Sequence, residues 1–219
     1  MKSRWMFAIA VFVLALAPTS VFAQSSGSFN FSADTTACTD IAGLLGGGTT
    51  VTSINTTMKV SSGSGVALVV RPSAVTGLLT NVSLSGKLGD ALSTGSAQAS
   101  IRFMVTVTPL SGQPAPQVTP GGPVTYDDRF TQISTNLFGL LSVCTDLVPC
   151  TFDLNQVTLS AHSFDFVVTG LRSGNYGVTV SWTPSTNFTA PNRALACVGP
   201  VVVTTEQVKI FNQSTGISF

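Results

Sequence analysis

The sequence predicts an all-β protein built as an antiparallel β-sandwich, of Greek-key or jelly-roll type. Two observations carry this prediction. Apolar and polar side chains alternate with a period of two in many segments, whereas helical periodicity is almost absent. These segments are short, and Gly, Ser and Asn separate them as turn residues.

The first residues predict export. Lys2 and Arg4 precede an apolar run over 5–17, and Pro18 and then 21–23 form a cleavage region with small residues. The apolar run is shorter than the roughly 20 residues that a spanning helix needs, and no later segment is long and apolar enough to span. We therefore expect residues 1–23 to be a signal peptide, and 24–219 to be a secreted or cell-surface chain, periplasmic or extracellular.

The clearest strand covers 99–108, where one face is apolar and the other is polar. The side chains expected to face the core are Ile101, Phe103, Val105 and Val107. Weaker alternation predicts strands at 53–60, 66–71, 78–84, 129–135, 156–160 and 201–211. One helical turn is expected within 38–48, capped by Thr39 or Asp40 and ended by the glycines at 46–48.

Two further strands, 164–169 and 176–183, carry the most specific local pattern. The motif L-x-x-G-x-Y-x-V-x-V occurs as Leu171, Gly174, Tyr176, Val178 and Val180. It resembles the corner between two strands in fibronectin type III and immunoglobulin-like sandwiches. The resemblance implies that the Tyr176 hydroxyl bonds back to nearby backbone. An immunoglobulin domain has a cysteine where this chain has Val178, which argues against antibody-type membership.

The order of two segments carries a second resemblance. "PVTYDDRF" is followed by "AHSFDFVVTGLRSGNYGVTV", and this order resembles a group of uncharacterised exported bacterial proteins. That resemblance implies a bacterial source and no particular activity.

Four cysteines predict two disulfides, since an even number in an exported chain indicates a disulfide framework. Three pairings are possible. The short segment "CTDLVPC" favours a bond between Cys144 and Cys150, which leaves Cys38 to pair with Cys197. A zinc site is the alternative, but the spacing lacks a C-x-x-C pair and the chain has one histidine.

The segment 109–123 interrupts the strand pattern with five prolines and three glycines, a composition that a central strand does not tolerate. It could be an excursion within one domain over 24–219. It could equally link two small sandwiches, 24–108 and 124–219. A bond between Cys38 and Cys197 would tie the halves together and therefore favours one domain.

Composition and motifs argue against several function classes. Ten basic and nine acidic residues nearly balance and the basic ones form no cluster, so a nucleic-acid partner is not expected. His162 is the sole candidate base, and the elbow G-x-S-x-G is absent. The glycines at 46–48 lack the lysine of a phosphate-binding loop. We expect no cofactor.

Carboxylates are the remaining groups that could act in catalysis or bind a metal ion. Asp127 and Asp128 are adjacent, so on a regular strand they point to opposite sides, whereas Asp153 and Asp165 could meet across strands. Calcium could take oxygen ligands from Asp127, Asp128, Asp146 and Asp153, but the D-x-D-x-D-G loop is missing.

We therefore expect a non-catalytic structural or interaction protein of the cell exterior, with an unknown protein or glycan partner. The alternative is a carbohydrate- or ligand-binding module that uses the rings of Trp182 or Tyr126. Trp182 is in phase with a core face, so we expect its ring to be less available to a ligand.

Overall fold

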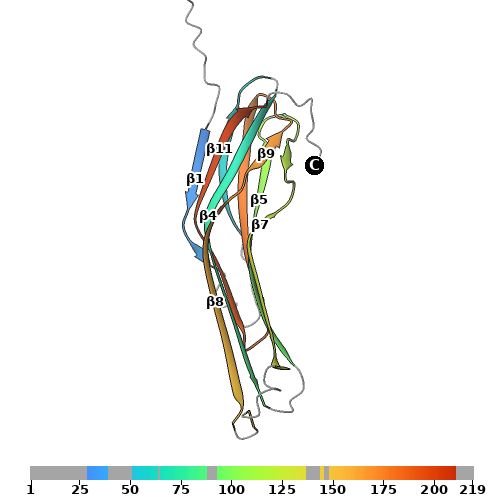
Figure 1. Cartoon of the computed structure of the whole chain (residues 1–219). Helices are drawn as coiled ribbons and strands as arrows, with labels where there is room; N and C mark the ends of the chain where they lie inside the picture. The colour runs from blue at the N-terminus through green and yellow to red at the C-terminus, as the bar shows by residue number, and fades with distance from the viewer. Residues whose placement is uncertain are drawn as a thin grey trace, which may run out of the picture.

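The computed structural model describes residues 29–38, 51–63, 65–87, 93–136, 144–145 and 148–210. They form two antiparallel sheets packed face to face in an elongated sandwich (Figure 1), which confirms the predicted fold class. These described residues include no α-helix, and hence no helix long and apolar enough to cross a membrane. The helical turn predicted within 38–48 lies outside the described residues from 39 onward.

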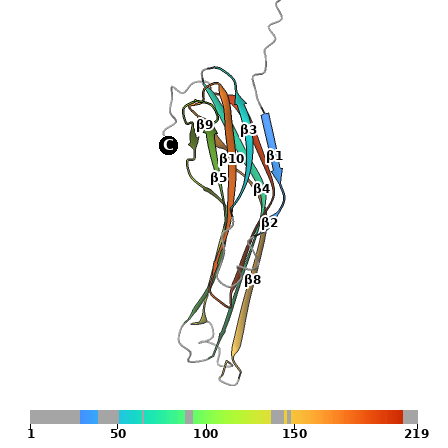
Figure 2. The same cartoon turned by 180° about the vertical axis from the view of Figure 1, so that it is seen from behind.

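The first sheet has seven strands in the order β1-β11-β4-β9-β6, with β2 pairing with β11 and β8 pairing with β4. Its strands are β1 (Phe29–Asp34), β2 (Ala37–Cys38), β4 (Val66–Gly86), β6 (Gln117–Thr119), β8 (Cys150–Ser163), β9 (Phe166–Thr169) and β11 (Arg193–Lys209). The second sheet has the order β3-β10-β5-β7. Its strands are β3 (Thr52–Val60), β5 (Thr94–Pro109), β7 (Val124–Ser134) and β10 (Gly174–Phe188). Figure 2 shows β3, β10 and β5 from the other side.

The segment 109–123 connects the two sheets. It leaves β5 of the second sheet at Pro109, contributes the short edge strand β6 to the first sheet and returns to β7 of the second. Each sheet takes strands from both sides of this segment. β6 has three residues and pairs with β9 alone, a position that suits a Pro-rich stretch because an edge strand tolerates missing donors.

The longest strand, β4, joins two segments for which the sequence predicts separate strands, 66–71 and 78–84. The feature that hides this continuity is Pro72. On one side of β4 the partner changes at this point: Val70 is opposite Phe166 of β9, and Ser73 is opposite Ser163 of β8. The register is the same before and after the change. On this side the ladder is therefore interrupted at Arg71 and Pro72, and Pro72 has no N–H to donate.

An ion pair spans this interruption. The guanidinium of Arg71 binds both carboxylate oxygens of Asp165, with Nη2 to Oδ2 at 2.7 Å. This hydrogen bond lowers the pKa of Asp165 below its usual value, and the same carboxylate raises the pKa of Arg71. The contact holds the bend between β8 and β9 against β4.

Large side chains fill the space between the two sheets. The biggest fully buried ones are Trp182, Tyr176, Phe103, Phe166 and Met58. The four residues predicted to face inward from 99–108 are all buried, as the alternation indicates. The Tyr176 hydroxyl donates to the carbonyl of Arg172 at 3.1 Å and accepts from its N–H at 3.0 Å. This is the local contact that the corner motif implies, although family membership stays a prediction.

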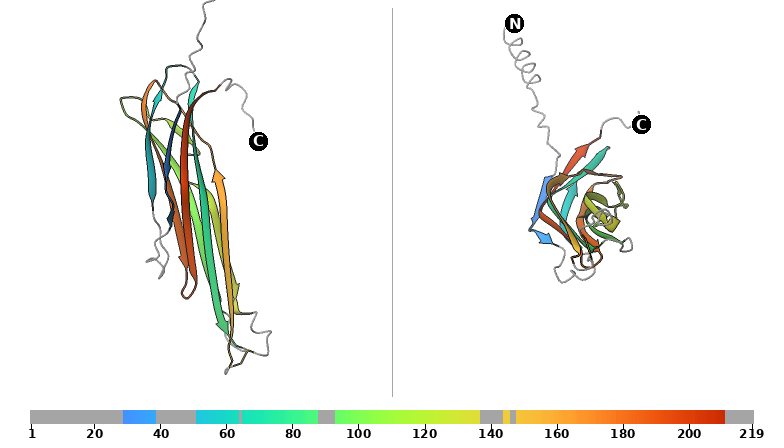
Figure 3. Two further views of the ribbon diagram at one scale, coloured as in Figure 1. Left: turned by 90° about the vertical axis from the view of Figure 1, so that its left-hand side faces the viewer. Right: turned by 60° about the horizontal axis from the view of Figure 1, so that its bottom comes forward.

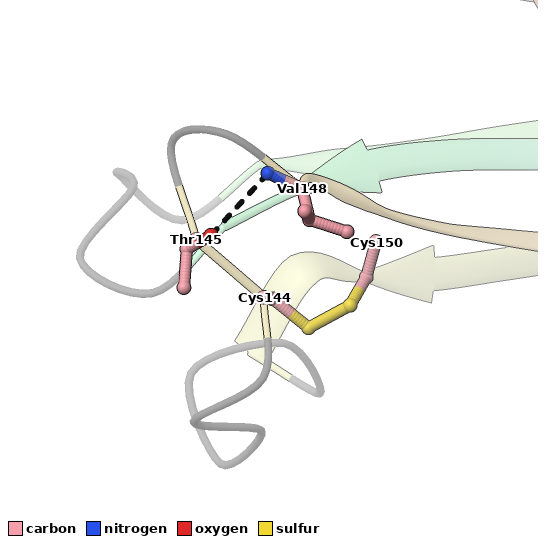
Figure 4. Close-up of a disulfide and its surroundings, with 4 residues drawn as sticks. All are labelled: Cys144, Thr145, Val148 and Cys150. Carbon is pink, nitrogen blue, oxygen red and sulfur yellow. Dashed lines mark hydrogen bonds between the residues drawn. A yellow bond between two sulfur atoms is a disulfide. The ribbon is translucent and has the colours of Figure 1, made fainter.

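The structure contains two disulfides, Cys38–Cys197 and Cys144–Cys150, in the pairing that the spacing favours. Cys38 in β2 lies directly opposite Cys197 in β11. The second disulfide closes a tight turn ahead of β8 (Figure 4), where Thr145 and Val148 exchange backbone hydrogen bonds of 3.0 and 3.2 Å. One disulfide therefore closes a long stretch of the chain, and the other closes a short one.

Candidate functional site

The two aromatic rings predicted as stacking platforms are inside the protein. Trp182 is fully buried and Tyr126 is 8 % exposed. Phe103 lies between them, with ring centroids 4.1 Å from Tyr126 and 5.8 Å from Trp182. Burial also raises the pKa of Tyr126, whose hydroxyl donates to the Pro72 carbonyl at 2.8 Å. The expectation that these rings stack on a ligand is therefore wrong, since both belong to the core.

A β-bulge turns an acidic residue inward beside Tyr126. The register of β5 and β7 shifts so that Ile101 faces Asp127, whereas Arg102 faces Thr125. Tyr126 is the extra residue, and two consecutive side chains, Tyr126 and Asp127, consequently face the interior. Asp128 points outward, where it accepts a hydrogen bond from Gln98 at 3.1 Å. The prediction that the two aspartates point to opposite sides is confirmed.

Asp127 of β7 lies next to hydroxyls and the single histidine from two other strands, β4 and β8. Its Oδ2 accepts from Ser160 of β8 at 3.0 Å and from Thr76 of β4 at 3.1 Å. The Ser160 hydroxyl is also 2.8 Å from Nε2 of His162, and this nitrogen is 3.8 Å from Asp127 Oδ2. The sequence analysis did not bring these residues together, because the inward turn of Asp127 depends on the bulge.

This Asp127 cluster has the residue types of a nucleophilic triad but a different connectivity. In a Ser-His-Asp triad, the acid binds one imidazole nitrogen and the serine binds the other. Here Nε2 of His162 faces both Ser160 and Asp127. Because a carboxylate only accepts, the Ser160 proton is best directed to Asp127, and Nε2–H of His162 then donates to Ser160. In this arrangement His162 is a donor to the hydroxyl and does not withdraw its proton.

A second buried polar contact lies further along the same strands. Thr80 of β4 and Thr131 of β7 are both buried, and their hydroxyls are 2.9 Å apart. Thr131 also donates to Gln156 of β8 at 2.9 Å. Hydroxyl, carboxylate and amide contacts thus join β4, β7 and β8 in this part of the sandwich. The part around Phe103 and Trp182 is instead filled by aromatic rings. The arrangement satisfies polar groups in the sandwich interior, as buried polar groups require.

The remaining carboxylates do not converge. Asp153 is opposite Ser83 of β4 and Asp165 binds Arg71, positions that are about 40 Å apart along a strand at 3.3 Å per residue. Asp146 lies outside the described residues. Within the described ranges, no three His, Cys, Asp or Glu side chains form a group that could hold a metal ion.

The outer face of the first sheet has an open groove of about 430 Å³. Its lining residues are Leu79, Asn81, Ser83, Asp153, Asn155, Pro191 and Arg193. One cross-strand row is polar, because Asn81 of β4 lies between Arg193 of β11 and Asn155 of β8. The next row, Leu79 between Leu195 and Val157, is apolar. The groove therefore offers hydrogen-bonding groups beside an aliphatic surface.

The strand that borders this groove, β8, is also an edge. It pairs with β4 alone among the described strands, and Figure 3 (left) shows it in gold at the margin of the sheet. Two of its outward side chains are large and apolar: Val157 is 69 % exposed and Leu159 is 77 % exposed. Sequence alternation could indicate these positions, but it could not show that the strand has a free edge.

Comparisons with known proteins assign neither a family nor a function. No family model matches the chain, and no curated protein matches it. Among solved structures, the VP2 subviral particle of infectious bursal disease virus is 10 % identical, with a TM-score of 0.16, and the match covers 85 % of this chain and 42 % of that one. The Gx strain of the same virus is 13 % identical, with a TM-score of 0.15, and the match covers 84 % and 42 %. The chain thus spans less than half the length of these structures, and likeness at this level carries no argument.

Proposed function

We propose that this chain is a secreted, non-catalytic structural or interaction protein of the cell exterior, working as one unit over 24–219. The observation that carries the proposal is the β8 surface. A 14-residue strand with a free edge also exposes Val157 and Leu159. Natural proteins usually protect such edges, so an exposed one is suited to contact with another chain.

Two further features support export and the absence of catalysis. Both cysteine pairs are oxidised, which is typical of exported proteins, and residues 1–23 have the pattern of a signal peptide. In the group nearest to an active-site set, Ser160 hydrogen-bonds to both Asp127 and His162, in an order that leaves Ser160 unactivated.

The proposal is tested by following the full-length chain in a bacterial host that exports proteins. We expect intact mass measurement to find an exported chain that starts at Gln24 and has two disulfides. The labelled protein should bind to isolated cell envelopes. Retention of residues 1–23 in the cytoplasm would contradict export. A hydrolytic activity that Ser160→Ala abolishes would contradict the non-catalytic assignment.

The outer groove favours the alternative function, a carbohydrate- or ligand-binding module. Asn81, Asp153, Asn155 and Arg193 line it, and within the described residues none of these side chains has a hydrogen-bond or salt-bridge partner. Amide, carboxylate and guanidinium groups of this kind can bind sugar hydroxyls. The ligand would thus contact these residues in place of Trp182 and Tyr126.

A glycan array separates the two functions. If the groove binds sugars, the protein is retained on a defined glycan, and Asn81→Ala or Asn155→Ala abolishes that retention. Gln132→Ala is the control, because Gln132 is exposed on β7 in the other sheet. Envelope binding that persists in both groove variants, without retention on any glycan, would favour the interaction protein.

A further inference from the structure

The free edge of β8 lacks the features that usually prevent strands from pairing. Its 14 residues contain no proline, glycine, lysine or arginine. Two other edges in the described part of the chain are better protected: β1 has six residues, and β7 carries the bulge at Tyr126. The β8 edge therefore offers a long row of backbone donors and acceptors to another strand.

We propose that β8 pairs antiparallel with β8 of a second copy of this chain, which would join the two first sheets into one continuous sheet. The inference rests on the proposed function and names the partner that the β8 surface contacts. A two-fold axis near Thr158 makes the interface self-complementary, because the same edge serves both copies.

Charge is compatible with a second copy and favours the antiparallel direction. Asp153 is the sole carboxylate of β8 and lies near one end of the strand. With the axis near Thr158, Asp153 is opposite the second copy's Ser163, and the two carboxylates are far apart. A parallel pairing in register would place the two Asp153 side chains next to each other, which is unfavourable.

The exposed apolar residues match in the same register. Val157 is opposite the second copy's Leu159, and Leu159 is opposite the second copy's Val157. Directly opposed side chains have Cβ atoms about 5 Å apart, so four aliphatic side chains would meet at the centre of the interface. This contact would cover the two most exposed large apolar side chains of the described residues.

Light scattering coupled to size-exclusion chromatography tests the pairing on the purified exported protein over a wide concentration range. We expect the mass of two chains for the wild type. The variant V157K/L159K puts lysine opposite lysine and should weaken association at least tenfold. The variant V157K/L159D puts lysine opposite aspartate twice and should restore the dimer. Phe31→Lys is the matched control, because Phe31 is 66 % exposed on β1 at the other side of the sheet, and should leave the dimer unchanged.

Several results would overturn the pairing. A wild type with the mass of one chain at every concentration would do so, as would a dimer that survives V157K/L159K or is lost in Phe31→Lys. Failure of V157K/L159D to restore association would overturn the register. A monomer that binds envelopes through β8 would overturn the self-pairing and leave the proposed function standing. A dimer that binds no envelope would overturn the proposed function and leave the self-pairing standing. Equal thermal melting of the variants and the wild type, measured at dilution, excludes misfolding as the cause.

Discussion

The hydroxyl of Tyr126 donates a hydrogen bond to the carbonyl oxygen of Pro72, 2.8 Å away and 54 residues earlier in the chain. The two residues belong to different sheets. Pro72 is the point at which the partner of β4 changes from β9 to β8, and the bond supplies a donor beside that interruption. A phenol from one sheet thus compensates for an irregular position in the other.

Removing this hydroxyl should destabilise the fold. Tyr126→Phe keeps the ring against Phe103 but leaves the Pro72 carbonyl without this partner. We expect the free energy of unfolding to fall by about 1 to 2 kcal/mol in urea titrations. An unchanged midpoint would mean that the carbonyl finds another donor. In Tyr176→Phe, which removes the two contacts to Arg172, we expect a loss of the same order.

The inward turn of Asp127 predicts different costs for two neighbouring residues. Asp127→Ala removes the acceptor of Ser160 and Thr76, and Thr76 is fully buried. We expect a loss of about 2 kcal/mol in the free energy of unfolding, measured in urea. Asp128→Ala, on the exposed side of the same strand, is the control and should change it by less than about 0.5 kcal/mol. Equal effects of the two substitutions would contradict the bulge.

The two disulfides should contribute unequally. Cys38–Cys197 spans 159 residues and Cys144–Cys150 spans six. On the loop-entropy model, replacing the first pair by serines lowers the free energy of unfolding by about 5 kcal/mol, and replacing the second lowers it by about 2 kcal/mol. Urea unfolding of each double variant without reductant measures both values. The reverse order would show that strain or residual unfolded structure dominates.

The Arg71–Asp165 pair predicts a pH dependence. Because the pKa of Asp165 is lower in the folded chain than in the unfolded chain, its contribution is present above the unfolded value, near pH 4. It is lost as the pH falls through the folded value. Asp165→Asn should therefore be less stable than the wild type at neutral pH, and the difference should vanish in acid. Both residues are nearly half exposed, so the effect is small, and thermal melts at several pH values will show it.

Much of the architecture follows from the sequence because alternation reports which face of a strand is apolar. Ile101 and Phe103 show this in β5, where every second side chain is apolar and buried. The same signal underestimates the length of β8, because it predicts a strand over 156–160 and the observed strand is Cys150–Ser163. Its inward residues include Gln156, Thr158 and Ser160, and hydrophobic alternation does not detect polar residues that face the interior.

By itself, the sequence determined the all-β class and the cysteine pairing that spacing favours, since both depend on local pattern. The tertiary structure alone decided that Tyr126 is a core residue, that Asp127 meets Ser160 and His162, and that β8 has a free edge. Each of these depends on the register between strands far apart in the chain. A shift of one residue, such as the bulge at Tyr126, changes which side chains face inward, and no local pattern reports it.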